Sequence, residues 1–492
     1  MSDSCWKTYL ERAASAPLTV KSRWHRTRDS RRHDVKANFQ QIQHYDLQIS
    51  PLDTEILDQA LPEDAPNLHS LIVECDEDLM EYHERYGNEW SSSLNNFLFD
   101  LAPALQSLHL GLLQFPWGMH STTLRVLRLS TYTYNHDISD DEMAHHEFDY
   151  VLETLRGMAC LEVLELQGDI LFRPPSHTPT PSVSSSLREL SLNGTMSRIG
   201  YVLAAYKASP NLYVQLISRE HYDERDLEII PETMEDWTSD CALAADILHS
   251  HLPSRHPEEP PYLTALQLVY RGVFYGISLR LGHVPFSPLD PYPKTTEERT
   301  THPSLNIDVS PQKPHARDAT SLHAKTLKLA RGIPDTYVGH LRHLTLSGLY
   351  WPHNDVVAYF EHAKSVESLS MYAFAEFTGN DKMARNAASF LTSLICTMTA
   401  QSDVVPSEPH KPQLLPALRD LHISGISFAY EVEHDGRDTT LDTALTAGLT
   451  MRLQSGHGLE TLQLEDCRDL ERNVADLWAS IVAQVTQTSK EE

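Results

Sequence analysis

A short hydrophobic pattern recurs along the chain: a leucine, two variable residues, a second leucine, one variable residue and a final aliphatic residue. The last two apolar positions are two residues apart, so both side chains point to one side of a short strand. The first leucine packs in the same layer as the chain enters that strand. Each copy therefore predicts a β-strand with one apolar face. The ten clear copies occupy residues 68–73, 105–110, 124–129, 161–166, 187–192, 263–268, 341–346, 366–371, 418–423 and 459–464, and a weaker copy occupies residues 324–329.

One strand of this kind cannot bury its apolar side alone, so neighbouring copies must stack into a parallel sheet with a continuous core. Between the copies lie stretches such as residues 149–156 and 355–362. Their apolar residues recur at three- and four-residue steps, as in helices that pack on a sheet. This alternation is typical of leucine-rich repeats. We therefore expect an α/β fold, a leucine-rich-repeat-like solenoid (an irregular horseshoe) with parallel strands on its concave face and helices outside.

The spacing of the copies predicts the domain organisation. Several intervals between copies are longer than the roughly 20–29 residues of uniform repeats, so we expect insertions between them. Two segments rich in proline and serine, residues 173–186 and 284–318, are the candidate insertions, although residues 305–309 also fit a strand. We expect an N-terminal segment over residues 1–60 and the solenoid over residues 61–492.

The middle residue of each Leu-x-Leu triplet points away from the core by the same alternation. On the concave face of a solenoid, a row of such residues would contact a protein partner, unless these residues are merely solvated. These candidate partner-binding residues are His109, Arg128, Glu165, Ser191, Thr345, Ser370, His422 and Gln463.

Charge and hydropathy narrow the possible partners. The 492 residues include 40 lysines and arginines against 68 acidic residues, a formal net charge of −28. A body this acidic repels phosphate backbones, which argues against nucleic-acid binding and favours a protein partner with a basic patch. The mean hydropathy is −0.37, and no apolar stretch approaches the length that a membrane-spanning helix needs. The first residues also lack a secretory signal, so we expect an intracellular protein, cytoplasmic or nuclear, without membrane contact.

The chain carries no strong catalytic signature, because it contains no GxGxxG loop, no P-loop and no GxSxG motif. The histidine clusters at residues 145–147 and 249–251 lack the HExxH spacing that places two ligands on one helix face. The six cysteines include no CxxC pair, so we expect buried thiols rather than a metal site. We therefore expect no metal, no cofactor and no catalysis; an enzyme that these motifs miss is the remaining alternative.

Four stretches resemble parts of one protein family. Residues 6–20 read W-x-x-x-L-E-R-x-x-S-A-P-L-T-V, and residues 161–194 contain two strand copies around a Pro/Ser-rich loop. Residues 415–421 read L-P-A-L-R-D-L, and residues 449–467 resemble a closing repeat followed by a helix from about Glu471. Together they resemble the leucine-rich-repeat regions of fungal F-box proteins, the substrate-recruiting subunits of SCF-type ubiquitin ligases.

This resemblance implies a non-catalytic module that binds a substrate of ubiquitination. In the family, an F-box that binds the ligase adaptor lies upstream of the stretch that begins here at Trp6. Only five residues precede Trp6, so we expect adaptor binding only if an F-box is encoded upstream. The alternative is an F-box-free leucine-rich-repeat scaffold or regulator unconnected to ubiquitin.

Overall fold

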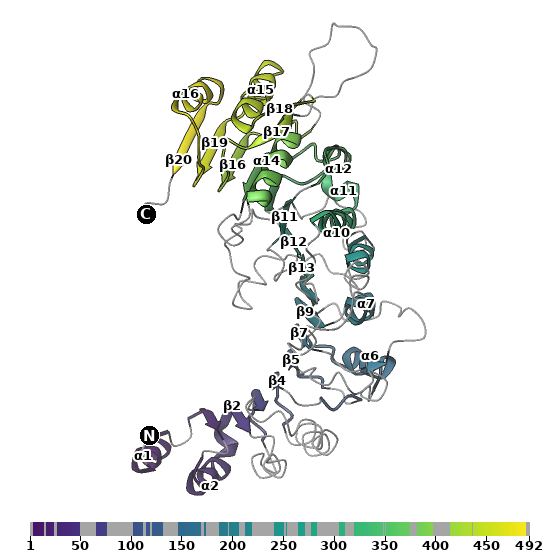
Figure 1. The fold of residues 1–492 in the computed structure, drawn as a ribbon. Coiled ribbons are helices and arrows are strands. Elements are labelled where there is room, and N and C mark those ends of the chain that lie inside the picture. The colour runs from purple at the N-terminus through teal and green to yellow at the C-terminus, as the bar shows by residue number, and fades with distance from the viewer. Residues whose placement is uncertain are drawn as a thin grey trace, which may run out of the picture. The chain divides into compact units, whose positions relative to one another are not determined.

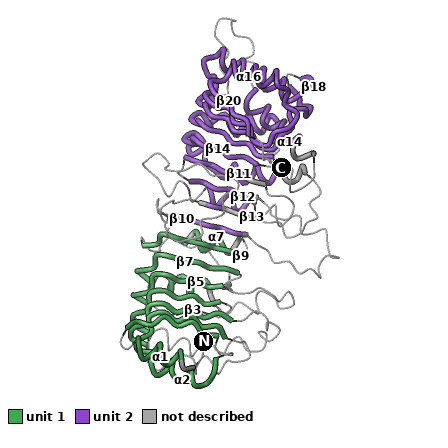
Figure 2. Tube along the Cα trace, turned by 90° about the vertical axis from the view of Figure 1, so that its left-hand side faces the viewer, with its two compact units in different colours: residues 1–209 green, residues 210–492 purple. Residues whose placement is uncertain are grey.

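The computed structural model divides into two compact units, Met1–Ser209 and Pro210–Glu492 (Figure 2). Both units combine parallel β-strands with α-helices, so the fold is α/β. The structure describes residues 3–13, 16–23, 27–49, 65–75, 102–111, 115–118, 121–130, 146–168, 172–173, 186–194, 196–205, 212–218, 241–249, 252, 264–270, 277–282, 305–309, 319–347, 349, 351–373, 381–396, 414–434 and 436–488.

The first unit contains a parallel sheet whose strands pair in the order in which they follow one another along the chain. In pairing order its strands are β1 (Leu18–Arg23), β2 (Ile42–Ile49), β3 (Ser70–Cys75), β4 (Ser107–Gly111), β5 (Val126–Ser130), β7 (Val163–Gln167) and β9 (Glu189–Gly194). Two short strands, β6 (His146–Glu147) and β8 (Phe172–Arg173), pair separately. The helices are α1 (Asp3–Ala13), α2 (Asp29–Ala37), the 3-10 turn η2 (Phe39–Gln41), α6 (Phe148–Gly157) and α7 (Met196–Ala205).

The leucine pattern explains why these segments are strands. Register places Leu127 opposite both Leu108 and Leu164, and Leu164 opposite Leu190. Each of these four side chains is at most 1% exposed. The second apolar position of each strand aligns in the same way, so two rows of aliphatic side chains run across the sheet and are buried on one face of it.

The second unit contains a sheet that is parallel except at one strand. In pairing order its strands are β10 (Tyr213–Ser218), β13 (Leu305–Val309), β12 (Ile277–Gly282), β11 (Ala265–Tyr270), β14 (His343–Ser347), β15 (Ser368–Tyr372), β16 (Asp420–Ser424), β19 (Thr461–Glu465) and β20 (Gln484–Thr488). β12 runs antiparallel to both of its neighbours. A separate hairpin joins β17 (Glu431–His434) to β18 (Arg437–Thr440).

The described helices of the second unit are α10 (Ala319–Arg331), α11 (Asp335–Val338), α12 (His353–Phe360), α14 (Asp381–Cys396), α15 (Leu441–Gln454), α16 (Arg472–Ile481) and a helix over residues 241–249. Three of them, α10, α12 and α14, contact the buried side chain of Trp351. The Trp351 ring centroid lies 5.9 Å from that of Phe360 on α12 and 5.5 Å from that of Phe390 on α14. Its indole N–H donates to Thr326 Oγ1 on α10 at 2.9 Å. In Figure 1, α10, α11 and α12 lie on the same side of the strands.

The strand predictions are confirmed for all ten clear copies of the pattern. Each copy forms a strand that begins two residues after its first apolar residue, as β4 does after Leu105. The helix expected over residues 149–156 is α6, and the one expected over residues 355–362 is α12. The strand over residues 305–309 is β13, and the helix expected from about Glu471 is α16.

The weaker copy at residues 324–329 is wrong as a strand, because these residues lie in α10. The segment is rich in alanine, leucine and lysine, which have high helix propensity, and it has no leucine at the first position of the pattern. Gly332 ends this helix close to the helix over residues 241–249. A Cβ atom at Gly332 would lie 2.5 Å from the Ala245 Cα, so this approach requires glycine.

The expectation of parallel strands throughout is wrong at β12. Residues 271–276 are the whole connection between β11 and β12. A parallel crossover needs a dozen or more residues, whereas an antiparallel partner needs only a short loop. The short connection therefore explains the reversed strand.

Two other expectations have mixed outcomes. Cys75, Cys241 and Cys396 are buried, but Cys5 and Cys160 are exposed, so the expectation of buried thiols is wrong for these two. The expected insertions at residues 173–186 and 284–318 lie largely outside the described residues, apart from Arg173 in β8, Ser186 and β13. The boundary expected at residue 60 stays a prediction; β1 and β2, which precede it, pair in the same sheet as β3.

Candidate functional site

Register brings the predicted partner-binding residues together within each unit. In the first unit, one row across neighbouring strands consists of His109, Arg128, Glu165 and Ser191. In the second unit, the corresponding row consists of Thr345, Ser370, His422 and Gln463. Both rows lie on the strand face opposite the buried leucines, which we call the outward face.

Only part of the outward face is accessible. Ser191 is 5% exposed and Thr345 is 3% exposed, so these two candidates are buried, while the other six are half-buried or exposed. Beyond Thr345 the row continues through four buried polar residues, Gln267, Arg280, Asn306 and Gln215. The accessible outward face of the second unit therefore lies on β15, β16, β19 and β20.

In the first unit, two acidic side chains on the outward face, Asp46 and Glu165, are paired with basic ones. Lys21 Nζ lies 2.9 Å from Asp46 Oδ2, and this contact raises the pKa of Lys21. Arg128 Nε lies 3.0 Å from Glu165 Oε2 on the adjacent strand. Cross-strand pairs of opposite charge stabilise a sheet and leave its face close to neutral.

Glu74, another accessible acidic residue of this face, is joined to Arg23 through the amide of Gln48. Arg23 Nε donates to Gln48 Oε1 at 2.9 Å, and Gln48 Nε2 donates to Glu74 Oε2 at 3.3 Å. These three residues lie on β1, β2 and β3 at one register position. The accessible carboxylates of this face, Asp46, Glu74 and Glu165, are therefore each linked to a basic side chain, whereas Glu189, at an outward position of β9, is fully buried.

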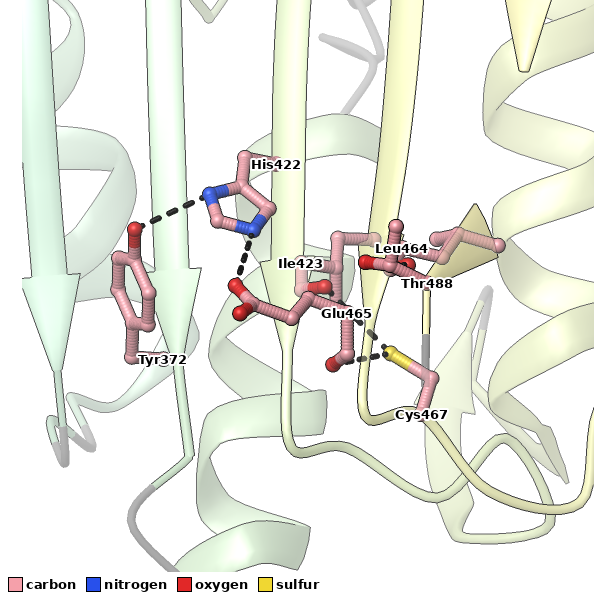
Figure 3. Close-up of polar contacts among 7 residues, drawn as sticks. All are labelled: Tyr372, His422, Ile423, Leu464, Glu465, Cys467 and Thr488. Atoms are coloured by element: carbon pink, nitrogen blue, oxygen red, sulfur yellow. Dashed lines mark hydrogen bonds and ion pairs between the residues drawn. The ribbon is translucent and has the colours of Figure 1, made fainter. Parts of the chain in front are cut away.

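In the second unit, Tyr372, His422 and Glu465 form a hydrogen-bonded chain across β15, β16 and β19 (Figure 3). His422 Nε2 lies 3.1 Å from Glu465 Oε2, and Nδ1 lies 3.0 Å from the Tyr372 hydroxyl. Because a carboxylate only accepts, Nε2 carries the proton, and in the neutral ring Nδ1 accepts from the tyrosine. The two rings pack edge to face with centroids 5.1 Å apart.

Burial decides the charge of this histidine. It lowers the pKa of His422 below its ordinary value, and the nearby Glu465 carboxylate offsets this effect only in part. His422 is therefore neutral near pH 7. The hydrogen-bonded series Tyr372–His422–Glu465 then carries one negative charge, on the Glu465 carboxylate, which accepts a hydrogen bond from the neutral imidazole.

A second carboxylate on the same face also has a neutral partner. Thr461 Oγ1 donates to Asp420 Oδ1 at 2.6 Å. Within the part of the chain that the structure describes, neither Asp420 nor Glu465 forms an ion pair with a lysine or an arginine. The outward-facing positions of β14, β15, β16, β19 and β20 include no lysine or arginine; they are His343, Thr345, Ser347, Ser368, Ser370, Tyr372, Asp420, His422, Ser424, Thr461, Gln463, Glu465, Gln484, Thr486 and Thr488.

No protein-family model matches this chain, and no curated protein matches it either. The resemblance to fungal F-box proteins therefore stays a prediction from the residues quoted above.

The described residues offer little support for metal or thiol chemistry. They contain no group of three or more His, Cys, Asp or Glu side chains arranged to hold a metal ion. No helix among them is long and apolar enough to cross a membrane. The Cys467 thiol beside Glu465 donates to the backbone oxygens of Ile423 and Glu465, at 3.5 Å each (Figure 3). Burial raises the pKa of this thiol, which keeps it protonated and a poor nucleophile.

Tyr372, Glu465 and Asp420 were not among the partner-binding residues predicted from the sequence. Tyr372 and Glu465 each follow the last apolar residue of their pattern, and Asp420 precedes the second leucine of its own. Period-2 alternation also places these positions on the outward face. The signal that would have found them is the extension of each Leu-x-Leu triplet by one residue on either side.

Proposed function

We propose that this chain is a non-catalytic protein-recognition module, folded as a leucine-rich-repeat-like solenoid, whose outward strand face binds a partner. The observation that carries the proposal is the alignment of polar side chains into rows across parallel strands, on the face opposite the buried leucines. Such rows form extended surfaces that suit another protein or peptide better than a small molecule.

The family resemblance gives this proposal a biological setting. In the setting that the resemblance to fungal F-box proteins implies, the partner is a substrate that the chain presents to an SCF-type ubiquitin ligase. A leucine-rich-repeat scaffold without a ubiquitin role uses the same face in the same way. Affinity purification from cells, with the ligase adaptor and ubiquitin conjugates quantified by mass spectrometry, separates the two settings.

The recognition proposal itself is tested by changing the charge of the outward face. Arg128→Glu and Gln463→Lys alter this face, one in each unit. The matched controls Glu153→Lys and Arg472→Glu reverse exposed charges on helices α6 and α16. We expect the face variants to lose partners that both controls retain, with unchanged circular dichroism for all four proteins. Equal partner sets from the face variants and the controls would refute recognition through this face.

A further inference from the structure

Asp420 and Glu465 on the outward face of the second unit differ from Asp46 and Glu165 of the first unit in how their charges are satisfied. In the first unit Asp46 and Glu165 each contact a basic side chain within 3.0 Å. In the second unit Asp420 and Glu465 are held by a threonine hydroxyl and a neutral imidazole. Neutral donors orient a carboxylate without cancelling its charge, so the face of the second unit keeps a negative potential.

The nearest described basic side chains do not change this balance. Arg419 precedes Asp420, but its guanidinium lies 3.2 Å from Glu460 Oε1, and both side chains are well exposed. Arg342 precedes His343 at the start of β14, next to Glu367 at the start of β15. Acidic and basic side chains therefore alternate at this edge, while the strand positions themselves carry two carboxylates without basic partners.

The two carboxylates are also accessible. The Glu465 side chain is 37% exposed, and Asp420 is half-buried. Tyr372 and Ser370 on the neighbouring strand β15 are half-buried as well. A half-buried carboxylate is screened less by solvent than one on a mobile loop, so it attracts a cation more strongly. The Tyr372 ring adds an aromatic surface of the kind that favours lysine and arginine side chains.

The register also sets the distance between the two charges. Asp420 lies opposite Thr461 on the adjacent strand, and Glu465 lies four residues further along that strand. With about 3.3 Å per residue and about 4.8 Å between strands, the Cα atoms of Asp420 and Glu465 lie about 14 Å apart. In an extended peptide, side chains four residues apart project from one side and are separated by about 13 Å.

We propose that the face formed by β15, β16 and β19 binds an extended segment of a protein partner through two lysine or arginine side chains, four residues apart, that contact Glu465 and Asp420. This inference rests on the proposed recognition function and specifies the partner's chemistry and the two anchoring residues.

The test uses the full chain and synthetic peptides, with binding measured by fluorescence anisotropy at low salt. The probe is a fluorescent nine-residue peptide with lysines at its third and seventh positions and serine, threonine and valine elsewhere. Its controls carry acetyl-lysine or glutamate at the same two positions. The protein variants are Glu465→Gln and Asp420→Asn, which remove charge with little change of shape. Glu433→Gln, an exposed residue of β17, is the matched control.

We expect the dilysine peptide to bind the parent and the Glu433→Gln variant equally, and each face variant about threefold to tenfold more weakly. Equal binding of the acetylated and lysine peptides, or equal binding by all three variants, would overturn the proposal. Self-association that both face variants abolish would assign this face to a second copy of the chain and would also overturn it. The proposed function fails separately, if the Arg128→Glu and Gln463→Lys variants keep every partner.

Discussion

Replacement of Leu164 by alanine tests the packing on which the fold depends. Leu164 is fully buried, and register places it between Leu127 on β5 and Leu190 on β9, which are also fully buried. Backbone hydrogen bonds to both neighbouring strands fix the position of β7, so the strands cannot close in on the vacated space. The substitution therefore leaves most of the deleted volume as a cavity.

This geometry sets the expected cost. Buried leucine-to-alanine substitutions lower the free energy of unfolding by about 2–5 kcal/mol. Because the site cannot collapse, we expect a loss of about 3–4 kcal/mol for Leu164→Ala. For a unit of this size, about 1 kcal/mol lowers the melting temperature by about 2–4 °C, so we expect a fall of about 6–16 °C. Leu164→Met conserves volume and should cost less than about 1.5 kcal/mol.

The neighbouring residue is the control for alternation. Glu165 lies on the outward face, with its side chain 16% exposed and paired to Arg128 at 3.0 Å. Glu165→Ala should cost about 1 kcal/mol or less, because this pair remains in contact with solvent. Calorimetry reports the melting temperatures, and hydrogen exchange of β5, β7 and β9 locates the change. Equal destabilisation by Leu164→Ala and Glu165→Ala would refute the assignment of the two faces.

Two further predictions concern the second unit. Arg452 is buried on α15, and its guanidinium donates to the Leu414 and Leu415 carbonyls at 3.3 and 2.8 Å, so Arg452→Met should destabilise the protein by about 2–4 kcal/mol in urea unfolding. Retention of full stability would show that these carbonyls do not need the arginine. Burial lowers the pKa of both His343, which faces Glu367, Arg342 and Asp420, and His422, which faces Tyr372 and Glu465. Because the unfolded chain then binds more protons than the folded one, the stability present above about pH 6.5 is lost on acidification. We therefore expect His422→Gln to reduce the fall in melting temperature between about pH 8 and about pH 5.5. An unchanged pH dependence of the melting temperature would contradict this reasoning.

The strands with leucine pairs were predictable because their signal is local. Alternating leucines indicate both a strand and its buried face within six residues, as at residues 161–166. β20 was not predictable in this way, because the sequence QVTQT offers one apolar residue and no leucine. It is a strand because it pairs along the whole length of β19, from Thr461 opposite Gln484 to Glu465 opposite Thr488. That cause lies in a neighbour rather than in the segment itself.

The candidate site was likewise predictable only where its signal is local. The outward direction of His422 follows from the pattern around Leu421 and Ile423, and the structure bears out that orientation. Its contacts with Tyr372, 50 residues before it, and Glu465, 43 residues after it, depend on the pairing of β15, β16 and β19. Register between distant strands is set by the whole sheet, so no local pattern could have joined these three side chains.

The extent of the accessible face limits how tightly it can bind. At one end, Thr345 on β14 is buried. At the other, β20 places Gln487 opposite Leu464, which replaces an apolar core position with a polar one and suits an edge strand exposed to water. The face between them spans four strands, about 14 Å across, and about five residues, about 17 Å along each strand. A patch of this size is well below the roughly 800 Å² per partner of a standard stable interface. It suits one short segment of a partner held by a few charged contacts. Binding at this face alone should therefore be weak and transient, and it should weaken steeply as salt is raised from about 50 to 300 mM.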